Sequence, residues 1–155
     1  MTQYTSFRKS LSRFATGVTV ITCSDKDGKH CGITANSFSS VSLDPPLILW
    51  NIAKVSNSLS AYLAAEFFAV NVLREDQEAL SRHFARTDHR LFDDIPHSVS
   101  DRGAPLLIDP LAVFECRTVE VHDCGDHYII IGEVLEHRHT DGEPLLFYDG
   151  RYRTF

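Results

Sequence analysis

The hydrophobic pattern of this chain is that of many short strands with few helices between them. Apolar residues recur at helical spacing in three stretches, at residues 7–14, 56–65 and 76–85, and each stretch predicts a helix. Runs of β-branched and aromatic residues, bounded by turn signals, predict strands. These strands are expected at residues 18–23, 30–34, 39–42, 47–52, 67–73, 111–123, 127–139, 145–148 and 151–154.

The order of these elements indicates a barrel. Helices interrupt the strands without a strand–helix–strand rhythm, which excludes a doubly wound parallel sheet. Asp149-Gly150 is a strong hairpin signal, and residues 86–103 predict a long irregular excursion on the surface. The apolar run at residues 47–52 predicts a strand buried on both faces. We therefore expect a mainly antiparallel, closed or nearly closed β-barrel with helical additions.

Length and composition are those of an ordinary globular domain. The 155 residues are 43% hydrophobic and carry 15 basic against 21 acidic side chains, a net charge of −6. This charge argues against general nucleic-acid binding but permits a local basic pocket for one anionic small molecule. No apolar run reaches the roughly 18 residues of a membrane span, and the first ten residues hold no apolar signal core. We expect one soluble, cytoplasmic domain over residues 1–155.

The four cysteines, Cys23, Cys31, Cys116 and Cys124, show no CxxC spacing. We interpret all four as buried free thiols in a reducing compartment, because a free cysteine behaves as a small hydrophobic residue. Cys116 and Cys124 could be joined only if the strand register brought them together.

Several motifs of known chemistry are missing from the sequence. The glycines never occur in GxGxxG spacing and there is no GxxxxGK[ST] loop, so a flavin or nicotinamide held in the dinucleotide-fold manner is excluded. HExxH, GxSxG and a zinc-type set of Cys and His are also absent. His137 and His139 share one face of a predicted strand, but this spacing is more typical of a solvated edge. We expect no metal site.

The most informative stretch is the polar segment at residues 32–47. Its small hydroxyl and amide side chains lie between two predicted strands, where ordinary packing would favour larger apolar residues. Such a segment offers short donors and backbone N–H groups to a planar heterocycle, and Gly32 and Ala35 would leave room for the ring. The alternative is a polar turn held by side-chain-to-backbone hydrogen bonds.

This segment is one of a series of motifs in which the chain resembles the flavin reductase family. The resemblance covers about residues 7–152 and is carried by the order of the motifs. His83 departs from the family's Arg-Phe-Ala pattern, which leaves the role of Arg82 open. The motifs are Phe14-Ala15-Thr16-Gly17-Val18-Thr19-Val20, residues 32–47, Phe68-Ala69-Val70-Asn71-Val72-Leu73, Arg82-His83-Phe84-Ala85, Pro105-Leu106-Leu107, Gly125-Asp126-His127, Gly132-Glu133-Val134 and Pro144-Leu145-Leu146-Phe147-Tyr148.

The resemblance implies an FMN-binding split barrel and a set of residues around the flavin. One wall of the site would be formed by six of the residues from Thr34 to Ser42. A phosphate-side loop before a helix would contribute four of the residues from Asn51 to Ser58, and the opposite side would be formed by the four from Arg82 to Ala85. A helix N-terminus and a lysine both favour an anion, which agrees with the phosphate-side assignment. The alternatives are helix capping for the two serines of the loop, core packing for the phenylalanine and a solvated charge for the arginine. The residues are Thr34, Ala35, Asn36, Ser37, Ser40, Ser42, Asn51, Lys54, Ser56, Ser58, Arg82, His83, Phe84 and Ala85.

His127 is the candidate catalytic residue. It follows a Gly-Asp turn at the start of a predicted strand, where a side chain can project into the mouth of a barrel. In the family, the corresponding histidine is associated with the nicotinamide side of the active site. A neutral imidazole could bind the carboxamide or relay a proton. The alternative is a histidine bonded to Asp126 or to the backbone, where it fixes the hairpin.

The resemblance implies an NAD(P)H:flavin oxidoreductase that supplies reduced flavin to a separate monooxygenase component. Its flavin would be FMN or FAD and its hydride donor NADH or NADPH, with Arg86, Arg90 or Arg102 available for a 2′-phosphate. Family split barrels pair as homodimers, and we carry that expectation over. Two alternatives remain: a non-enzymatic flavin or haem-type carrier or sensor, and a reductase whose bound flavin passes electrons to iron or another acceptor.

Overall fold

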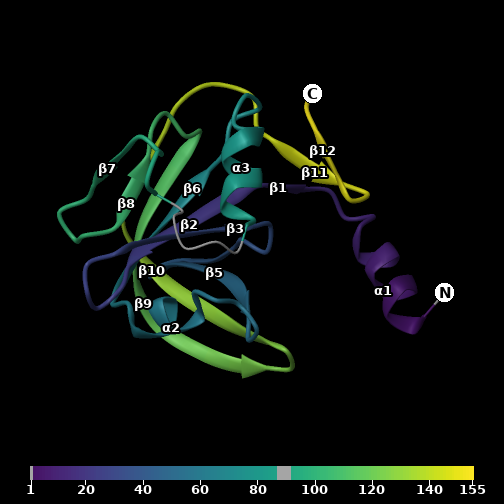
Figure 1. Ribbon diagram of the computed structural model, residues 1–155, viewed down its shortest axis with the longest axis horizontal. Coiled ribbons are helices and arrows are strands. Elements are labelled where there is room, and N and C mark those ends of the chain that lie inside the picture. The colour runs from purple at the N-terminus through teal and green to yellow at the C-terminus, as the bar shows by residue number, and fades with distance from the viewer. Residues whose placement is uncertain (1, 87–91) are drawn as a thin grey trace.

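A seven-stranded antiparallel sheet dominates the computed structural model, which describes residues 2–86 and 92–155 (Figure 1). The strands are β2 (Thr19–Ser24), β3 (His30–Ala35), β4 (Ser39–Leu43), β5 (Pro46–Ala53), β6 (Phe67–Val72), β9 (Ala112–Cys124) and β10 (His127–His139). Their order across the sheet is β3-β2-β6-β9-β10-β5-β4. β3 and β4 follow one another in the chain but form opposite edges of this sheet, so hydrogen bonds between them do not close it. The expected split, mainly antiparallel barrel is confirmed.

Smaller elements surround this sheet. A three-stranded sheet joins β1 (Thr16–Gly17), β11 (Leu146–Tyr148) and β12 (Arg151–Arg153) in the order β1-β11-β12. A separate hairpin joins β7 (His97–Val99) to β8 (Pro105–Leu107). The helices are α1 (Gln3–Leu11), α2 (Leu59–Ala64) and α3 (Glu78–Phe84).

The structure corrects the prediction for the stretch at residues 86–103. We expected no regular structure there, yet the stretch contributes β7, which pairs with β8 in the register His97↔Leu107. Three-residue strands are too short for an alternating pattern to show. The pairing is stabilised instead by tertiary packing, because Leu106 and Leu107 are buried and β8 lies against β2 and β6.

The main core lies between the large sheet and α2. Trp50 of β5 packs edge-on against Tyr62 of α2 at 5.0 Å between ring centroids, with Phe68 of β6 at 6.1 Å. All three side chains are at most 2% exposed, and burial of each contributes about 1.5–3 kcal/mol. The Tyr62 hydroxyl donates a hydrogen bond of 2.6 Å to the Ile21 carbonyl, so its polar end is satisfied inside the core.

The strand β5 is buried on one face only, which contradicts the prediction of two buried faces. Ile48, Trp50 and Ile52 face the core, whereas alternate residues on the other face remain half-buried. That second face is continuous with the candidate site, because Asn51 lines a cavity there. The apolar run misled the prediction, since Leu47 and Leu49 are apolar without being fully covered.

The hairpin predicted from Asp149-Gly150 is confirmed, and both residues have positive φ, at 51° and 73°. All four cysteines are free. Cys23 and Cys116 are buried, whereas Cys31 is half-buried and Cys124 is exposed, so the prediction of four buried thiols is wrong for the last two. Within residues 2–86 and 92–155, no helix combines the length and apolar character needed to cross a membrane.

Candidate functional site

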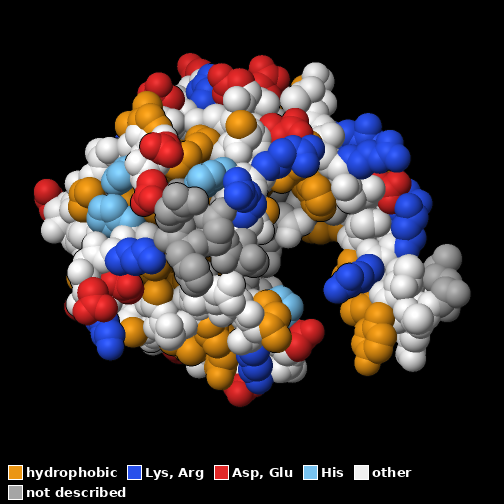
Figure 2. Space-filling view, viewed as in Figure 1, with side chains coloured by type: hydrophobic (Ala, Val, Ile, Leu, Met, Phe, Trp, Pro, Cys, Tyr) orange, Lys and Arg blue, Asp and Glu red, His pale blue; other side chains and the backbone are white. Residues whose placement is uncertain are grey.

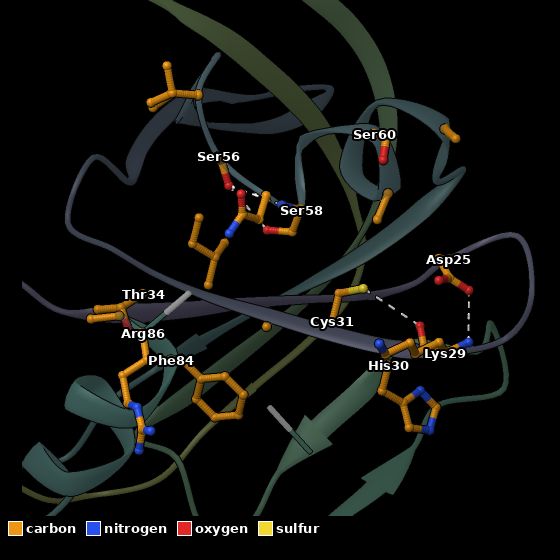
Figure 3. Close-up of a pocket in the computed structure, with 18 of the residues that line it drawn as sticks. Asp25, Lys29, His30, Cys31, Thr34, Ser56, Ser58, Ser60, Phe84 and Arg86 are labelled. Carbon is orange, nitrogen blue, oxygen red and sulfur yellow. Dashed lines mark hydrogen bonds between the residues drawn. The ribbon is translucent and has the colours of Figure 1, made fainter. Parts of the chain in front are cut away.

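Two cavities lie side by side along the free edge of β3. The larger, of about 680 Å³, lies between the β2–β3 hairpin, the loop before α2, α2 itself and the end of α3 (Figure 3). The smaller, of about 520 Å³, lies between the segment after β3, the end of β5 and the β9–β10 turn. Both are lined by Ile33, Thr34 and Ala53, so the two cavities adjoin one another.

The edge of β3 presents backbone hydrogen-bonding groups to this site. The Asp25 N–H donates to the Lys29 carbonyl at 2.8 Å in the β2–β3 hairpin. Hydrogen-bonded and non-hydrogen-bonded pairs alternate along antiparallel strands, so Gly32 and Thr34 take the non-hydrogen-bonded positions opposite β2. Their N–H and C=O groups point to the side where, in residues 2–86 and 92–155, no strand pairs with β3. This row of donors and acceptors suits a flat heterocycle that carries both.

Hydroxyl groups hold the polar segment in place. Thr34 Oγ1 donates to the Ser81 carbonyl of α3 at 2.6 Å. Ser37 Oγ accepts from the Asn51 N–H at 2.9 Å and donates to the Asn51 carbonyl at 3.3 Å. The side-chain-to-backbone bonds weighed as an alternative for this segment are therefore present. They fix the wall and leave the backbone edge and Asn36 to face the cavity.

Asn51 carries a polar atom that suits a flavin. Its Oδ1 is buried, and the described residues provide it with no hydrogen-bond partner. A buried acceptor without a donor costs about 1–3 kcal/mol. Thr16 Oγ1, Trp50 Nε1 and Thr118 Oγ1 are in the same state among the described residues, but of the four residues Asn51 alone lines either cavity, so its amide can turn toward a donor bound there. The ring N3–H of a flavin is a donor of this kind, and the neighbouring backbone edge matches its carbonyl and nitrogen acceptors. The residues present thus fit a flavin.

Glycine 32 does not leave room for a ligand ring, contrary to our expectation. A Cβ built there would lie 2.6 Å from two atoms of the Phe84 ring and 3.2 Å from Phe92. The absent side chain instead allows α3 to pack closely onto β3. Phe84 is 1% exposed and also lines the larger cavity, so the core and site roles proposed for it coexist.

The loop before α2 contributes its serines to the site but not the lysine expected beside them. Ser56 and Ser58 line the larger cavity with their hydroxyl oxygens 3.2 Å apart, and Ser58 does not cap α2 with its side chain. Lys54 Nζ instead donates to Asp123 at 2.5 Å and lies 5.2 Å from the Tyr128 ring centroid. The hydrogen bond to Asp123 raises the pKa of Lys54.

Other cations line the larger cavity. Arg86, Lys26 and Lys29 do so, together with His30. Figure 3 shows Arg86 on the side of the α3 end and Lys29 with His30 at the hairpin. Only Arg86 was a candidate from the sequence. The two lysines were missed because a charged turn normally indicates a solvated hairpin.

Besides Lys54, four more of the site residues named from the sequence lie away from both cavity linings. Arg82 donates to Glu78 at 2.9 and 2.7 Å and stacks over the Tyr152 ring at 4.8 Å. His83 packs edge-on against Phe84 at 4.9 Å. Ser40 and Ser42 lie on β4, the far edge strand. Ala85, in contrast, lines the larger cavity.

The two other arginines considered for a 2′-phosphate are not placed in the site. Arg102 lies between Glu115 and Glu136, at 3.8 and 3.3 Å. Arg90 lies outside the described residues.

His127 lines the smaller cavity at the start of β10, opposite Ala53 of β5. Its Nδ1 lies 2.7 Å from Asp126 Oδ1, and this bond lowers the pKa of Asp126. Within the described part of the chain Nε2 has no partner. The bond to Asp126 that we weighed as an alternative is therefore present, and it orients the ring with one nitrogen left for a ligand.

A family model and the similar proteins of known name all indicate the same family. The family model for the flavin reductase like domain matches residues 11–155. The chain is 49% identical over 150 residues to the FMN reductase (NADH) SmoA of Agrobacterium fabrum, covering 97% of this chain and 85% of that protein. It is 41% identical over 147 residues to HsaB of Rhodococcus jostii, the reductase subunit of a flavin-dependent monooxygenase, covering 94% and 75%.

Solved structures agree. The NADH:FAD oxidoreductase SgcE6 of Streptomyces globisporus C-1027, solved with NAD and FAD fragments, superposes with a TM-score of 0.93 at 37% identity, covering 99% of this chain and 93% of that chain. BorF, the flavin reductase component of a bacterial two-component tryptophan halogenase, superposes with a TM-score of 0.90 at 37% identity, and the match covers 98% of each chain. The chain belongs to the flavin reductase like domain family.

Proposed function

We propose that this protein is a flavin reductase that transfers hydride from NADH to FMN or FAD and supplies reduced flavin to a separate monooxygenase component. The observation that carries the proposal is the pair of adjoining cavities along the open edge of β3, with an Asn51 oxygen in the wall of the smaller one that has no partner among the described residues. The relatives SmoA and HsaB, named for these activities, support the nicotinamide and the partner.

The residues of the chain divide the work between binding and orientation. The backbone groups of Gly32 and Thr34 and the amide of Asn51 bind the ring, while Ser56, Ser58 and Arg86 face the end of the site where an anion is expected. When bound, the flavin supplies a ring that accepts hydride. The protein fixes the stacking distance and keeps the reacting face clear of water.

His127 stands on the nicotinamide side in this proposal. Asp126 holds Nδ1, and Nε2 can donate to or accept from a carboxamide in the smaller cavity. Replacement of His127 by Ala should slow hydride transfer more than it weakens flavin binding. The matched control is His122→Ala, because His122 is an exposed histidine that is likewise bonded to a carboxylate, Glu120 at 2.7 Å. Single-turnover absorbance of the flavin separates the two effects. An unchanged transfer rate in His127→Ala removes this residue from the mechanism.

The activity itself is tested by NADH and NADPH oxidation with added FMN or FAD, in all four combinations. We expect turnover that depends on added flavin, with NADH preferred. Absence of turnover in every combination would refute the proposal. Tight flavin binding without oxidation would favour a carrier, and turnover without flavin release would favour a bound-flavin reductase.

We also propose that the protein forms a homodimer through α1. No residue of α1 is buried, and Tyr4, Phe7 and Leu11 share one helical face at 82%, 62% and 58% exposure. Phe14, in the turn that follows the helix, is 79% exposed. Figure 1 shows α1 standing away from the barrel, and Figure 2 shows apolar side chains on this arm across a hollow from the body. A continuous apolar face of this kind is typical of an interface. A second copy of the chain is the partner that we propose.

Sedimentation velocity tests the dimer. We expect the wild type to sediment as a dimer and Phe7→Ser with Leu11→Ser to shift it to the monomer, with a near-unchanged circular dichroism spectrum. Lys26→Ser is the surface control. A monomeric wild type, or a double variant that remains dimeric, would overturn this interface.

A further inference from the structure

Two cysteines lie directly opposite one another in the wall of the larger cavity. The β2–β3 register pairs Cys23 with Cys31, so their side chains project from the same face of the hairpin. Cys23 is fully buried in the main core, while Cys31 is partly exposed and lines the cavity. One thiol is thus accessible and its neighbour is sealed behind it.

The register is compatible with a disulfide. Asp25 and Lys29 form a hydrogen-bonded pair, and Cys23 and Cys31 lie two residues away from them along β2 and β3. Because hydrogen-bonded pairs recur at every second position, Cys23 and Cys31 also occupy a hydrogen-bonded position. Opposite Cα atoms at such a position are about 5.5 Å apart. Disulfides span Cα distances of roughly 4.4–6.8 Å, so the Cα separation is within range. Opposite Cβ atoms at a hydrogen-bonded pair lie near about 5.5 Å and must approach to about 3.5–4.5 Å, so formation of the bond requires a local shift of the hairpin.

The surroundings divide the two thiols by reactivity. The Cys31 thiol donates to the Lys29 carbonyl at 3.7 Å. The neighbouring Cys23 thiol lowers the pKa of Cys31, against the opposing effect of burial. The same interaction between the two thiols, with burial, raises the pKa of Cys23. The neighbouring charges act in opposite senses on Cys31, since Asp25 raises its pKa and Lys29 lowers it. Tyr62 is not a competing donor, because its hydroxyl is bonded to the Ile21 carbonyl.

We propose that Cys31 and Cys23 form a peroxide-oxidisable dithiol in the wall of the flavin site, with Cys31 as the reactive thiol and Cys23 as the resolving thiol. The Cys31 thiolate attacks hydrogen peroxide, an S–O bond forms as the O–O bond breaks, and water leaves after proton uptake. The Cys23 thiol then attacks the Cys31 sulfur, which forms the S–S bond and releases a second water. The dithiol loses two electrons, and one peroxide is reduced to two waters.

The oxidant follows from the proposed function, and only this part of the inference rests on it. Reduced flavin that meets dioxygen returns to the oxidised ring and gives hydrogen peroxide. A reductase that releases reduced flavin without a consuming partner would therefore produce the oxidant at its own cavity. Flavin reduction without a monooxygenase to consume the product would then oxidise Cys23 and Cys31 to a reversible disulfide.

The test uses the reduced, full-length protein without flavin or nicotinamide. It is treated with a small excess of hydrogen peroxide, quenched with N-ethylmaleimide and mapped by peptide mass spectrometry. We expect a Cys23–Cys31 disulfide, with the loss of two hydrogen atoms, that dithiothreitol reverses. Cys116 and Cys124 should remain alkylated, and Cys31 should be consumed at least about fivefold faster than Cys124. Because no turnover is measured, failure of the proposed function leaves this result unaffected.

Variants separate the two roles. In Cys23→Ala, dimedone should trap a sulfenic acid on Cys31, and in Cys31→Ala, Cys23 should stay unreactive. Cys124→Ala is the matched control and should form the disulfide at the wild-type rate. The proposal is overturned if Cys124 reacts first while Cys23 and Cys31 stay alkylatable, or if Cys31 passes to the sulfinic acid with Cys23 still reduced. If Cys23→Ala does not fold, the wild-type peptide map alone decides between these outcomes.

Discussion

Replacement of Gly32 by Ala tests the close contact that joins α3 to the site. The added Cβ would lie 2.6 Å from the Cδ1 and Cε1 atoms of Phe84 and 3.2 Å from Phe92. Phe84 is 1% exposed in a packed cluster, so its ring cannot swing into solvent without losing that burial. Either Phe84 or the backbone of β3 must therefore move.

The expected cost is that of overpacking a core, about 1–3 kcal/mol of unfolding free energy. For a chain of this size, each kcal/mol shifts the melting temperature by roughly 2–4 °C, so the variant should melt some 2–12 °C lower. Because Gly32 and Phe84 both line the larger cavity, flavin affinity should fall as well. Denaturant unfolding and flavin fluorescence titration measure the two effects separately.

Gly17→Ala is the matched control. Gly17 lies in β1 with no atom within 4 Å of a built Cβ and without a positive φ, so the same methyl group should change stability by less than about 1 kcal/mol and leave flavin affinity unchanged. Equal stability and equal flavin affinity in the two variants would refute the close contact between β3 and α3.

Three further predictions concern individual hydrogen bonds in the core, at the site and at α1. Asn71→Ala removes a fully buried amide whose donor and acceptor ends are both bonded, so unfolding free energy measured in urea should fall by at least about 2 kcal/mol; a smaller loss would contradict the role of this amide. Ser37→Ala removes both bonds to the Asn51 backbone, and flavin titration should show weaker binding than in Ser39→Ala, whose hydroxyl contacts only the neighbouring carbonyl of its own strand. Asp149 has a lowered pKa, chiefly because Lys9 donates to it at 2.5 Å, so its stabilisation of α1 is present above the ordinary aspartate pKa and is lost as the pH falls through the lowered value. Hydrogen exchange should show faster exchange of α1 in Asp149→Asn at pH 7, whereas unchanged protection would mean that this carboxylate does not hold the helix.

The sequence predicted the strands well because their signals are local. The two long strands around Cys124-Gly125-Asp126 and the final hairpin both carry alternation with a turn between them, and β9–β10 and β11–β12 follow these patterns. The stretch at β7 lacked such a signal, and its structure depends on packing of β8 against the barrel.

The candidate site was predictable only in part. The segment Thr34 to Ser37 and the histidine after the Gly-Asp turn stood out as residue types unusual for their positions, and the fold brings them to one cavity. Lys54 was expected in the site on its sequence position alone, and its side chain instead lies along Asp123 on β9. Sequence proximity to a loop does not specify which way a long side chain extends.

By itself, the amino-acid sequence determined which segments become strands, where the chain turns and which family the motifs resemble, because periodicity and turn chemistry act over a few residues. Only the tertiary structure decided that, among the described residues, β3 ends the sheet with one backbone edge free and Asn51 keeps a buried oxygen without a partner, and that Cys31 lines the same cavity as Ser58. These features depend on how strands distant in sequence pair across the sheet. The proposed flavin site lies along the edge of β3, which has no strand partner among the described residues.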